Sequence, residues 1–379
     1  MSMGGPMASG IASNAAAARA GALLTVDLAA IRANYRLLRE RAGGAQVAGV
    51  LKADAYGLGM AQVAQALVRE GCTVFFTAHL DEGMRLRALV PAASTIYVLH
   101  GPMPSTAADF VDHDLVPVLN DPGQVREWIA AGAERGLRLP AAIQVDTGMS
   151  RMGLSPADLA ALGTPAQWLA GLEPVLLMSH LACADVADHP MNAAQRARFD
   201  ELRALFPGVP CSLANSSAVF LGPEFRYDLV RPGAALYGIN PQPGQANPLR
   251  QAVALQARIV QVRDVPDGAA VGYGARFIAA GPRRIATIAI GYADGWLRSL
   301  TNRGCAFVDG VAAPIAGTVS MDSITLDVTG LPPACVAAGQ TVELLGPHQE
   351  VDEVAAQAGT IGYEVLTRLG ARFHRSYID

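Results

Sequence analysis

One residue, Lys52, is the only lysine in this chain of 379 residues. Lysine and arginine together number 29, so 28 of the basic residues are arginines. A coding bias toward arginine and alanine would remove most surface lysines without selecting for any function. Arginine stays charged and cannot form an imine, whereas a lysine amine can lose its proton and attack a carbonyl carbon. Lys52 is therefore a candidate for covalent chemistry.

The neighbours of Lys52 favour a functional position. Lys52 follows a short apolar run, residues 47–51, and Tyr56 stands four residues later, with Gly57 and Gly59 loosening the turn. The plain alternative is a lysine whose aliphatic stem lies along apolar surface at a strand end. The remaining elements must decide between the two interpretations.

Strand-like and helix-like segments alternate through the first two thirds of the chain, which predicts an α/β fold with eight strands. The helix-length segments are exemplified by 60–70, 81–89, 123–134 and 191–206. Eight such units favour a closed parallel (β/α)8 barrel of the TIM type, with its chemistry at the carboxyl ends of the strands. The predicted strands are 46–51, 73–78, 96–100, 115–119, 141–146, 175–180, 210–214 and 229–236.

From about residue 253 the pattern changes to β-branched runs separated by Gly, Pro and Asp turns, which predicts a mostly β second domain. We expect a flexible leader over 1–22, a barrel over 23–252 and a β-rich domain over 253–379. The leader lacks a basic start followed by a continuous apolar stretch and is not a secretion signal.

Composition excludes several classes of function. With 29 basic and 33 acidic residues the net charge is −4, so nucleic acid is not an expected partner. No apolar stretch approaches the roughly 20 residues of a membrane helix, and we expect a soluble protein. Five scattered cysteines without CxxC spacing and seven histidines without HxH or HxxxH pairing suggest neither disulfides nor a metal site. A reducing cytoplasm fits best.

The segment Lys52-Ala-Asp-Ala-Tyr-Gly resembles the cofactor-lysine motif of the alanine racemases, whose lysine forms a Schiff base with pyridoxal 5′-phosphate (PLP). The resemblance continues in order through almost the whole chain after the leader. It is carried by DTGMSRMG (146–153), His180 in SHLACAD, NSS (215–217), RPGAALYG (231–238), GYG (272–274), GYADG (291–295), GTVSMD (317–322) and YEV (363–365).

The resemblance implies a set of site residues. Lys52 would carry the cofactor, and Arg151 would contact its phenolic oxygen and the substrate carboxylate. A phosphate dianion is bound well by loop amides at a helix N-terminus. The resemblance implies that Ser216, Gly233 and Ala234 form this phosphate site, with the hydroxyls of Tyr56 and Tyr363 as further donors. Gly233 could instead be a turn glycine and Ser216 a helix N-cap, and these roles are compatible with phosphate binding. The cofactor-binding set is Lys52, Tyr56, Arg151, His180, Asn215, Ser216, Arg231, Gly233, Ala234 and Tyr363, and the substrate-binding set is Arg151, Tyr292, Met321 and Asp322.

Racemisation removes the α-proton from one face and returns one to the other, so it needs two bases. The resemblance assigns Lys52 to the D-alanine face and Tyr273, from the partner subunit of a homodimer, to the L-alanine face. A hydrogen-bonded series would join Tyr273 through His180 to Arg231 at the pyridine nitrogen. Arginine cannot accept a proton, so that nitrogen stays neutral and prompt reprotonation is favoured. Alternatives are a surface ion pair for Arg231 and a core histidine for His180.

The chain departs from the family pattern at two positions. Many relatives have a carbamylated lysine two residues before the Asp of DTGM, where this chain has Gln144. We expect Gln144 to hold Arg151 through its neutral amide oxygen, more weakly than a charged partner would. Leu58 replaces the histidine that usually follows Tyr-Gly.

The resemblance implies an alanine racemase that supplies D-alanine for peptidoglycan. Met321 and Asp322 from the partner subunit would close the substrate pocket with Tyr273, and Tyr292 and Tyr363 would line a narrow entrance that suits a side chain as small as methyl. Serine or broader racemisation and a catabolic role stay open. A decarboxylase of the same architecture would pair the pyridine nitrogen with an acidic residue, and the presence of Arg231 argues against this alternative. A non-catalytic PLP carrier would lack the β domain and its Tyr273.

Overall fold

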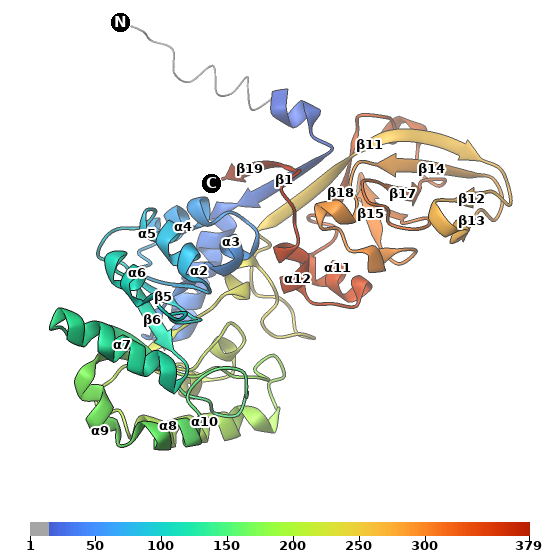
Figure 1. The fold of residues 1–379 in the computed structure, drawn as a ribbon. Coiled ribbons are helices and arrows are strands. Elements are labelled where there is room, and N and C mark those ends of the chain that lie inside the picture. The colour runs from blue at the N-terminus through green and yellow to red at the C-terminus, as the bar shows by residue number, and fades with distance from the viewer. Residues whose placement is uncertain (1–14) are drawn as a thin grey trace, which may run out of the picture. The chain divides into compact units, whose positions relative to one another are not determined.

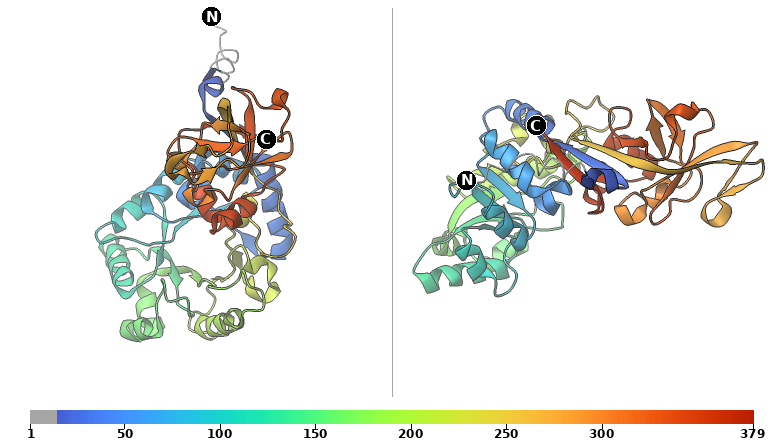
Figure 2. Two further views of the ribbon diagram at one scale, coloured as in Figure 1. Left: turned by 90° about the vertical axis from the view of Figure 1, so that its right-hand side faces the viewer. Right: turned by 90° about the horizontal axis from the view of Figure 1, so that it is seen from above.

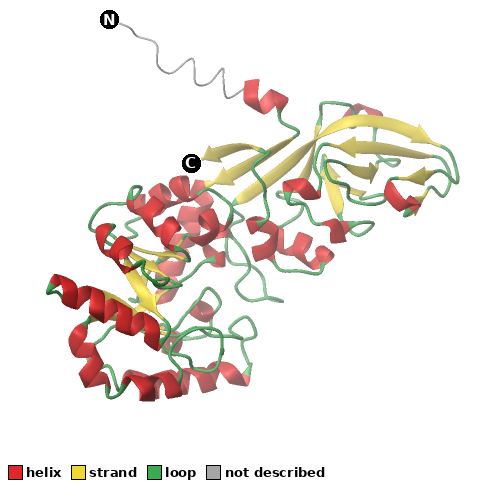
Figure 3. Cartoon of the chain, viewed as in Figure 1, coloured by secondary structure: helices red, strands yellow, loops and turns green. Residues whose placement is uncertain are grey.

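The computed structural model describes residues 15–379, which form two compact units (Figure 1). One unit is residues 29–250, and the other combines the described residues up to Leu28 with Gln251–Asp379. Helices dominate the first and strands the second (Figure 3). No helix in the described part of the chain is long and apolar enough to cross a membrane.

Residues 29–250 form a closed parallel barrel, as the sequence predicts. Strands β3 to β9 pair in sequence order in one sheet, and β10 pairs with β2. Backbone hydrogen bonds from Asp228 to Cys211 and from Arg231 to Ala214, of 3.0 and 2.9 Å, join β9 to β10 and close the ring. The strands are β2 Gln46–Val47, β3 Gly49–Val50, β4 Val74–Thr77, β5 Thr95–Val98, β6 Val116–Leu119, β7 Pro140–Gln144, β8 Glu173–Met178, β9 Cys211–Ser212 and β10 Leu229–Val230.

Helices surround these strands, and the view along the unit shows them on the outside (Figure 2). The central strands are buried on both faces, which is why they are nearly continuous apolar runs rather than alternating ones. The helices are α2 Leu28–Ala42, α3 Lys52–Tyr56, α4 Met60–Arg69, α5 Leu80–Arg87, α6 Ala107–Asp112, α7 Pro122–Arg135, α8 Pro156–Leu162, α9 Pro165–Trp168 and α10 Pro190–Arg203. All four helices named from the sequence are present within a few residues.

The second unit is built on one long strand, β11 (Val253–Val265). The sheet order is β16-β15-β18-β11-β1-β19, and β14 pairs with both β11 and β17. Strand β11 pairs with β1 and β18 over residues 253–258 and with β14 from Ile259 onward, where the register shifts between Ile259 and Gln261. The other elements are β1 Ala22–Asp27, β12 Ala270–Val271, β13 Phe277–Ile278, β14 Arg283–Ile288, β15 Cys305–Val308, β16 Val311–Pro314, β17 Ile324–Asp327, β18 Thr341–Leu345, β19 His374–Ile378, α11 Val351–Ala358 and α12 Gly362–Thr367.

Two expected boundaries differ in the structure. The barrel was expected from residue 23, but β1 pairs with β11 and β19 and so belongs to the β-rich unit. The expected leader, 1–22, falls largely on residues 1–14, which lie outside the described residues. Its later part is structured: residues 15–19 are helical, and β1 begins at Ala22.

The eighth expected strand, 229–236, is also shorter than predicted. Strand β10 ends at Val230, and a 3₁₀ turn occupies Ala234–Tyr237. Pro232 has no amide hydrogen to donate to a neighbouring strand, which stops the ladder at this point.

Arg258 ties the start of the described chain to the β-rich unit. Its Nε donates to the carbonyl of Ala20 at 3.0 Å, and its Nη2 donates to Ala17 at 3.0 Å. We expect Arg258→Ala to lower the free energy of unfolding by roughly 1–2 kcal/mol, because two partly buried carbonyls lose their donor. Urea denaturation checks this. Arg263→Ala, on the same strand, is the control, and an equal loss in both variants would contradict the anchoring role.

Candidate active site

Lys52 lies at the end of β3, where α3 is a turn of the opposite hand to an ordinary helix. Ala53, Asp54, Ala55 and Tyr56 have φ of 54°, 54°, 55° and 56°. Left-handed helix costs about 1–2 kcal/mol for each non-glycine residue, so other contacts must offset this turn. One is the bond from the amide of Met60 to Asp54 Oδ1, of 2.8 Å. The reversed turn carries the side chain expected to bind the cofactor.

The surroundings of Lys52 favour its neutral amine. Burial is the largest cause that lowers the pKa of Lys52, followed by the positive charge of Arg151, and Arg231 acts in the same direction. Glu82 opposes them. A neutral amine is the form that attacks a carbonyl carbon and accepts a proton. The structure thus brings Lys52, Arg151 and Arg231 together, as the sequence predicts.

Arg231 is a buried cation whose acceptors are all neutral. Only 5% of it is exposed. Its Nη2 donates to the carbonyl of Ser179 at 2.6 Å, and its Nη1 donates to Ser212 Oγ. No ion pair to Arg231 is recorded within residues 15–379. The alternative of a surface ion pair is therefore wrong, and the positive charge is available to groups in the barrel mouth.

His180 is held in its neutral form beside Arg231. Arg231 Nη2 lies 3.3 Å from His180 Nδ1. Because a guanidinium can only donate, Nδ1 is the acceptor and the ring proton belongs on Nε2. Burial, and then the charge of Arg231, lower the pKa of His180 to about 3. The Arg231–His180 half of the expected hydrogen-bonded series is present.

A cradle for an anion is assembled from three separate segments. Ser216 Oγ accepts from the amides of Gly233 and Ala235, at 2.9 and 3.2 Å. A Cβ on Gly233 would lie 2.2 Å from the hydroxyl oxygen of Tyr56, so only glycine permits this approach. The buried amide of Ala234 has no recorded hydrogen bond to any residue in 15–379. An unpaired buried donor beside two hydroxyls fits the phosphate of PLP.

Asn215 has a visible structural role. Its Oδ1 accepts from the amide of Ala218 at 3.1 Å, and its Nδ2 donates to the carbonyl of Leu181 at 3.4 Å. These bonds fix the turn that presents Ser216. Its expected cofactor contact stays a prediction.

Arg151 is carried by a loop that Asp146 shapes. Asp146 Oδ1 accepts from the amides of Gly148, Met149 and Ser150, at 2.8, 3.0 and 3.1 Å. Arg151 is exposed and lines a cavity of about 500 Å³ together with Asp121 and Gln124. Arg151 is thus placed to meet an anionic group at the carboxyl ends of the strands.

The expected bond between Arg151 and Gln144 is not formed. Gln144 is the last residue of β7 and is buried, and no hydrogen bond between the two side chains is recorded in the described part of the chain. The two-residue spacing puts Gln144 on the strand but does not determine where its amide points. The sequence-based expectation is wrong on this contact.

Gln195 of α10 is a site-shaping residue that the sequence reading missed. Its Nε2 donates to Thr147 Oγ1 at 3.1 Å and to the carbonyl of His180 at 2.9 Å. Its Oε1 accepts from the amide of Ala182 at 2.9 Å. Gln195 thereby links the Arg151 loop to the strand end that carries His180. No sequence motif marks it, because its partners are far away along the chain.

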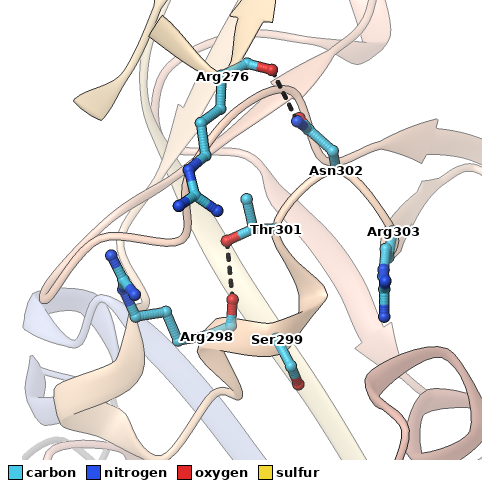
Figure 4. A pocket seen from close by; sticks show the side chains of 6 residues that line it. All are labelled: Arg276, Arg298, Ser299, Thr301, Asn302 and Arg303. Atoms are coloured by element: carbon cyan, nitrogen blue, oxygen red, sulfur yellow. Dashed lines mark hydrogen bonds between the residues drawn. The ribbon is translucent and has the colours of Figure 1, made fainter. Parts of the chain in front are cut away.

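In the β-rich unit, Tyr273 stands on a tight turn and is 75% exposed. Thr318 Oγ1 donates to its carbonyl at 2.8 Å. Asn302 braces the same region by donating to the carbonyl of Arg276 at 2.8 Å and accepting from the amide of Gly317 at 2.6 Å (Figure 4). The backbone is fixed while the phenol stays accessible.

Figure 4 shows the cavity that adjoins this bracing. Arg276 and Arg298 extend along one side, and Arg303 lies on the other. The cavity measures about 440 Å³ and has no acidic lining residue. It is a positively charged part of the surface around the Tyr273 turn.

Tyr292, Met321 and Asp322 lie together in the same unit. The amides of Tyr292 and Ala293 donate to the carbonyls of Ser320 and Met321, both at 3.0 Å. A Cβ on Gly291 would lie 2.3 Å from both carbonyl oxygens, which explains the glycine. Arg372 bridges Asp294 and Asp322, at 2.6 and 2.7 Å. Three expected substrate-site residues are thus grouped, with their side chains exposed.

Tyr363, expected at the cofactor phosphate, is the second residue of α12. Its ring is 37% exposed. Its expected cofactor contact stays a prediction.

These two units, with a lysine and a phosphate cradle at the mouth of a barrel, define a barrel-type PLP enzyme. Two family models match almost the whole described chain. One, the N-terminal domain of alanine racemase, matches residues 26–241, and the other, its C-terminal domain, matches residues 252–377. The chain belongs to the alanine racemase family.

Named relatives agree with this assignment. A protein of Mesorhizobium japonicum called "Alanine racemase, catabolic" is 53% identical, covering 95% of this chain and 94% of its own. An alanine racemase of Rhodospirillum rubrum is 50% identical, covering 95% and 96%. The Bartonella henselae alanine racemase with covalently bound pyridoxal phosphate superposes with a TM-score of 0.92 at 40% identity, covering 95% of this chain and all of the other.

The low pKa of His180 predicts a pH-dependent stability. Below the ordinary histidine pKa of 6.5 the unfolded chain binds a proton at this position, whereas folded His180 stays neutral until about pH 3. The free energy of unfolding should therefore fall as the pH drops from 6.5 toward 3. His180→Gln, whose amide oxygen can still accept from Arg231, should reduce this slope by up to about 1.4 kcal/mol per pH unit.

Urea melts between pH 4.5 and 7 measure the slope. The half-buried His113 of the same unit provides the matched variant, His113→Gln. An unchanged slope in His180→Gln would mean that His180 is protonated in the folded protein.

Proposed function

We propose that this protein is a PLP-dependent racemase that interconverts L-alanine and D-alanine. The observation that carries the proposal is the site around Lys52: the chain's single lysine, with a lowered pKa, lies at a barrel strand end beside Arg151 and Arg231. The family membership supports the same reaction. A non-catalytic carrier would have no use for the β-rich unit with its accessible Tyr273.

The residues of the barrel mouth fit PLP. Lys52 would bind its aldehyde carbon. Ser216, Tyr56 and the Gly233–Ala234 turn, through the unpaired amide of Ala234, would bind its phosphate. Arg231 would face the pyridine nitrogen and leave it unprotonated, because an arginine can only donate. Bound PLP supplies the electron withdrawal that weakens the Cα–H bond of an amino acid. Asn215, His180 and, from the β-rich unit, Tyr363 complete the proposed cofactor site.

Two bases on opposite faces of the substrate would move the α-proton. Lys52 Nζ would serve the D-alanine face, since a lowered pKa increases the share of neutral amine, the form that accepts a proton. The hydroxyl of Tyr273 would serve the L-alanine face. Arg151 would hold the substrate carboxylate through a charge-assisted hydrogen bond, which orients the Cα–H bond between the bases.

We propose that the active enzyme is a homodimer in which each site takes Tyr273, Met321 and Asp322 from the second chain. Tyr273 and Met321 are 75% and 52% exposed, and this accessible surface supports a face that another chain covers. With Tyr292, these residues would restrict the substrate to a small side chain. A cytoplasmic location is proposed because all five cysteines are free.

We propose that the enzyme supplies D-alanine for peptidoglycan. The name of the Mesorhizobium japonicum relative favours a catabolic role as the alternative. Serine or broader racemisation is a second alternative of the same chemistry. A panel of L-amino acids tested for exchange of the α-hydrogen with deuterium separates strict from broad specificity.

The cofactor proposal makes Lys52 the only side chain that can be labelled. Purified protein loaded with PLP should be yellow, and borohydride should fix the cofactor to one peptide, the one that contains Lys52. Lys52→Arg should stay unlabelled, because a guanidinium cannot form the bond. Absorbance spectra and peptide mass spectrometry are the measurements. A colourless wild-type protein without a labelled Lys52 peptide would remove the cofactor from the proposal.

The shared site can be tested by complementation. Lys52→Ala and Tyr273→Phe should each lose at least about 100-fold in kcat, because each lacks one base. Unfolding and refolding an equal mixture should restore about a quarter of wild-type activity: half the dimers are mixed, and each mixed dimer has one intact site. A refolded mixture as inactive as its components would show that Tyr273 acts within its own chain or not at all.

A further inference from the structure

We propose that Glu82 is a positioning residue of this active site, whose buried carboxylate holds the left-handed turn that follows Lys52 against the end of strand β4. The inference deepens the proposed function, because it concerns how the cofactor lysine is aimed. It rests on the hydrogen bonds of one side chain to two separate segments of backbone.

Glu82 is the third residue of α5 and is only 7% exposed. Its Oε2 accepts from the amides of Ala78 and His79, at 2.9 and 3.1 Å. The bond from His79 is that of an ordinary helix cap, in which a glutamate at this position accepts from the amide of the residue before the helix, and the bond from Ala78 adds the preceding amide. Capping α5 explains one oxygen of the carboxylate.

The second carboxylate oxygen of Glu82 bonds to a different segment of the backbone. Glu82 Oε1 accepts from the amide of Ala53 at 2.6 Å. That amide belongs to the peptide bond directly after Lys52 and is the first amide of the left-handed turn. The contact joins residues 29 positions apart. A helix cap does not require it.

The position of this bond determines what it does. The Lys52–Ala53 peptide is fixed on one side by the end of β3 and on the other by Glu82, so the direction of the Lys52 side chain is set. Within the turn, the amide of Gly57 donates to the carbonyl of Ala53 at 2.7 Å, so the residue that Glu82 holds also holds the end of the turn. Hydrogen bonds to an ionised carboxylate are stronger than neutral ones. The charge of Glu82 therefore suits a turn with unfavourable backbone angles.

Glu82→Gln separates the two tasks of the side chain. Glutamine is as good as glutamate at this position of a helix cap, so its carbonyl oxygen can keep the bonds to Ala78 and His79. Its NH2 group would then face the amide of Ala53, donor against donor. Glu353→Gln is the matched control, because Glu353 caps α11 through the amide of Glu350 at 2.7 Å and makes no recorded contact with residues 52–57.

The experiment compares holoenzymes of wild type, Glu82→Gln and Glu353→Gln. Hydrogen–deuterium exchange of the peptide covering 52–57 should accelerate about tenfold or more in Glu82→Gln. The visible circular dichroism of the bound cofactor should change, because its tether is aimed differently, and kcat should fall about 10-fold or more with a smaller change in KM. Glu353→Gln should match wild type in all three.

The proposal is overturned if the 52–57 peptide of Glu82→Gln exchanges its amide hydrogens at the wild-type rate and the visible circular dichroism of the bound cofactor is that of wild type. If that variant does not fold, Glu82→Asp decides with the same measurements, since it keeps the charge but is too short to reach both segments. The exchange readout needs no cofactor chemistry. A wild-type protein that binds no PLP yet shows the Glu82-dependent exchange would refute the proposed function and leave the contact standing.

Discussion

The barrel mouth depends on a buried positive charge with no carboxylate beside it. Arg231 donates only to neutral acceptors of Ser179, Ser212 and His180. Burying a cation without a partner is expensive, so proteins seldom do it unless another charge is to be bound there. Its field contributes to the lowered pKa of both Lys52 and His180. Burial is the largest cause of both lowered pKa values, and the charge of Arg231 adds to it in favour of the neutral lysine and the neutral histidine.

The two units would contribute different kinds of groups to the proposed active site. The barrel offers backbone amides and hydroxyls at fixed positions, because each is anchored at the end of a strand. The β-rich unit offers exposed side chains on turns whose backbone is braced, as Asn302 and Thr318 do around Tyr273. Rigid backbone with accessible side chains is what a surface requires if it is to complete a site across a subunit boundary.

The sequence predicted what local patterns determine. Apolar runs alternating with helical segments located all eight barrel strands, and the motifs located the residues that gather around Lys52. The sequence could not predict the left-handed turn, because the segment Ala-Asp-Ala-Tyr contains no glycine, the residue that usually marks positive φ. The contacts of Glu82 and Gln195 reach residues 29 and 48 positions away and exist only in the folded chain. The strand Ala22–Asp27 was assigned to the wrong unit, since its pattern does not reveal which sheet it joins.

The absence of the expected hydrogen bond between Gln144 and Arg151 affects the charge balance of the site. Arg151 has no carbamate or carboxylate partner recorded within residues 15–379, so it joins Arg231 as an unneutralised cation near Lys52. A cofactor phosphate and a substrate carboxylate would give these two arginines the anionic partners that the described residues do not provide. The charges of Arg151 and Arg231 would then attract such anions to the barrel mouth. Replacing Gln144 by a charged acceptor would neutralise part of that attraction, so the neutral amide is compatible with an Arg151 left free for the substrate carboxylate.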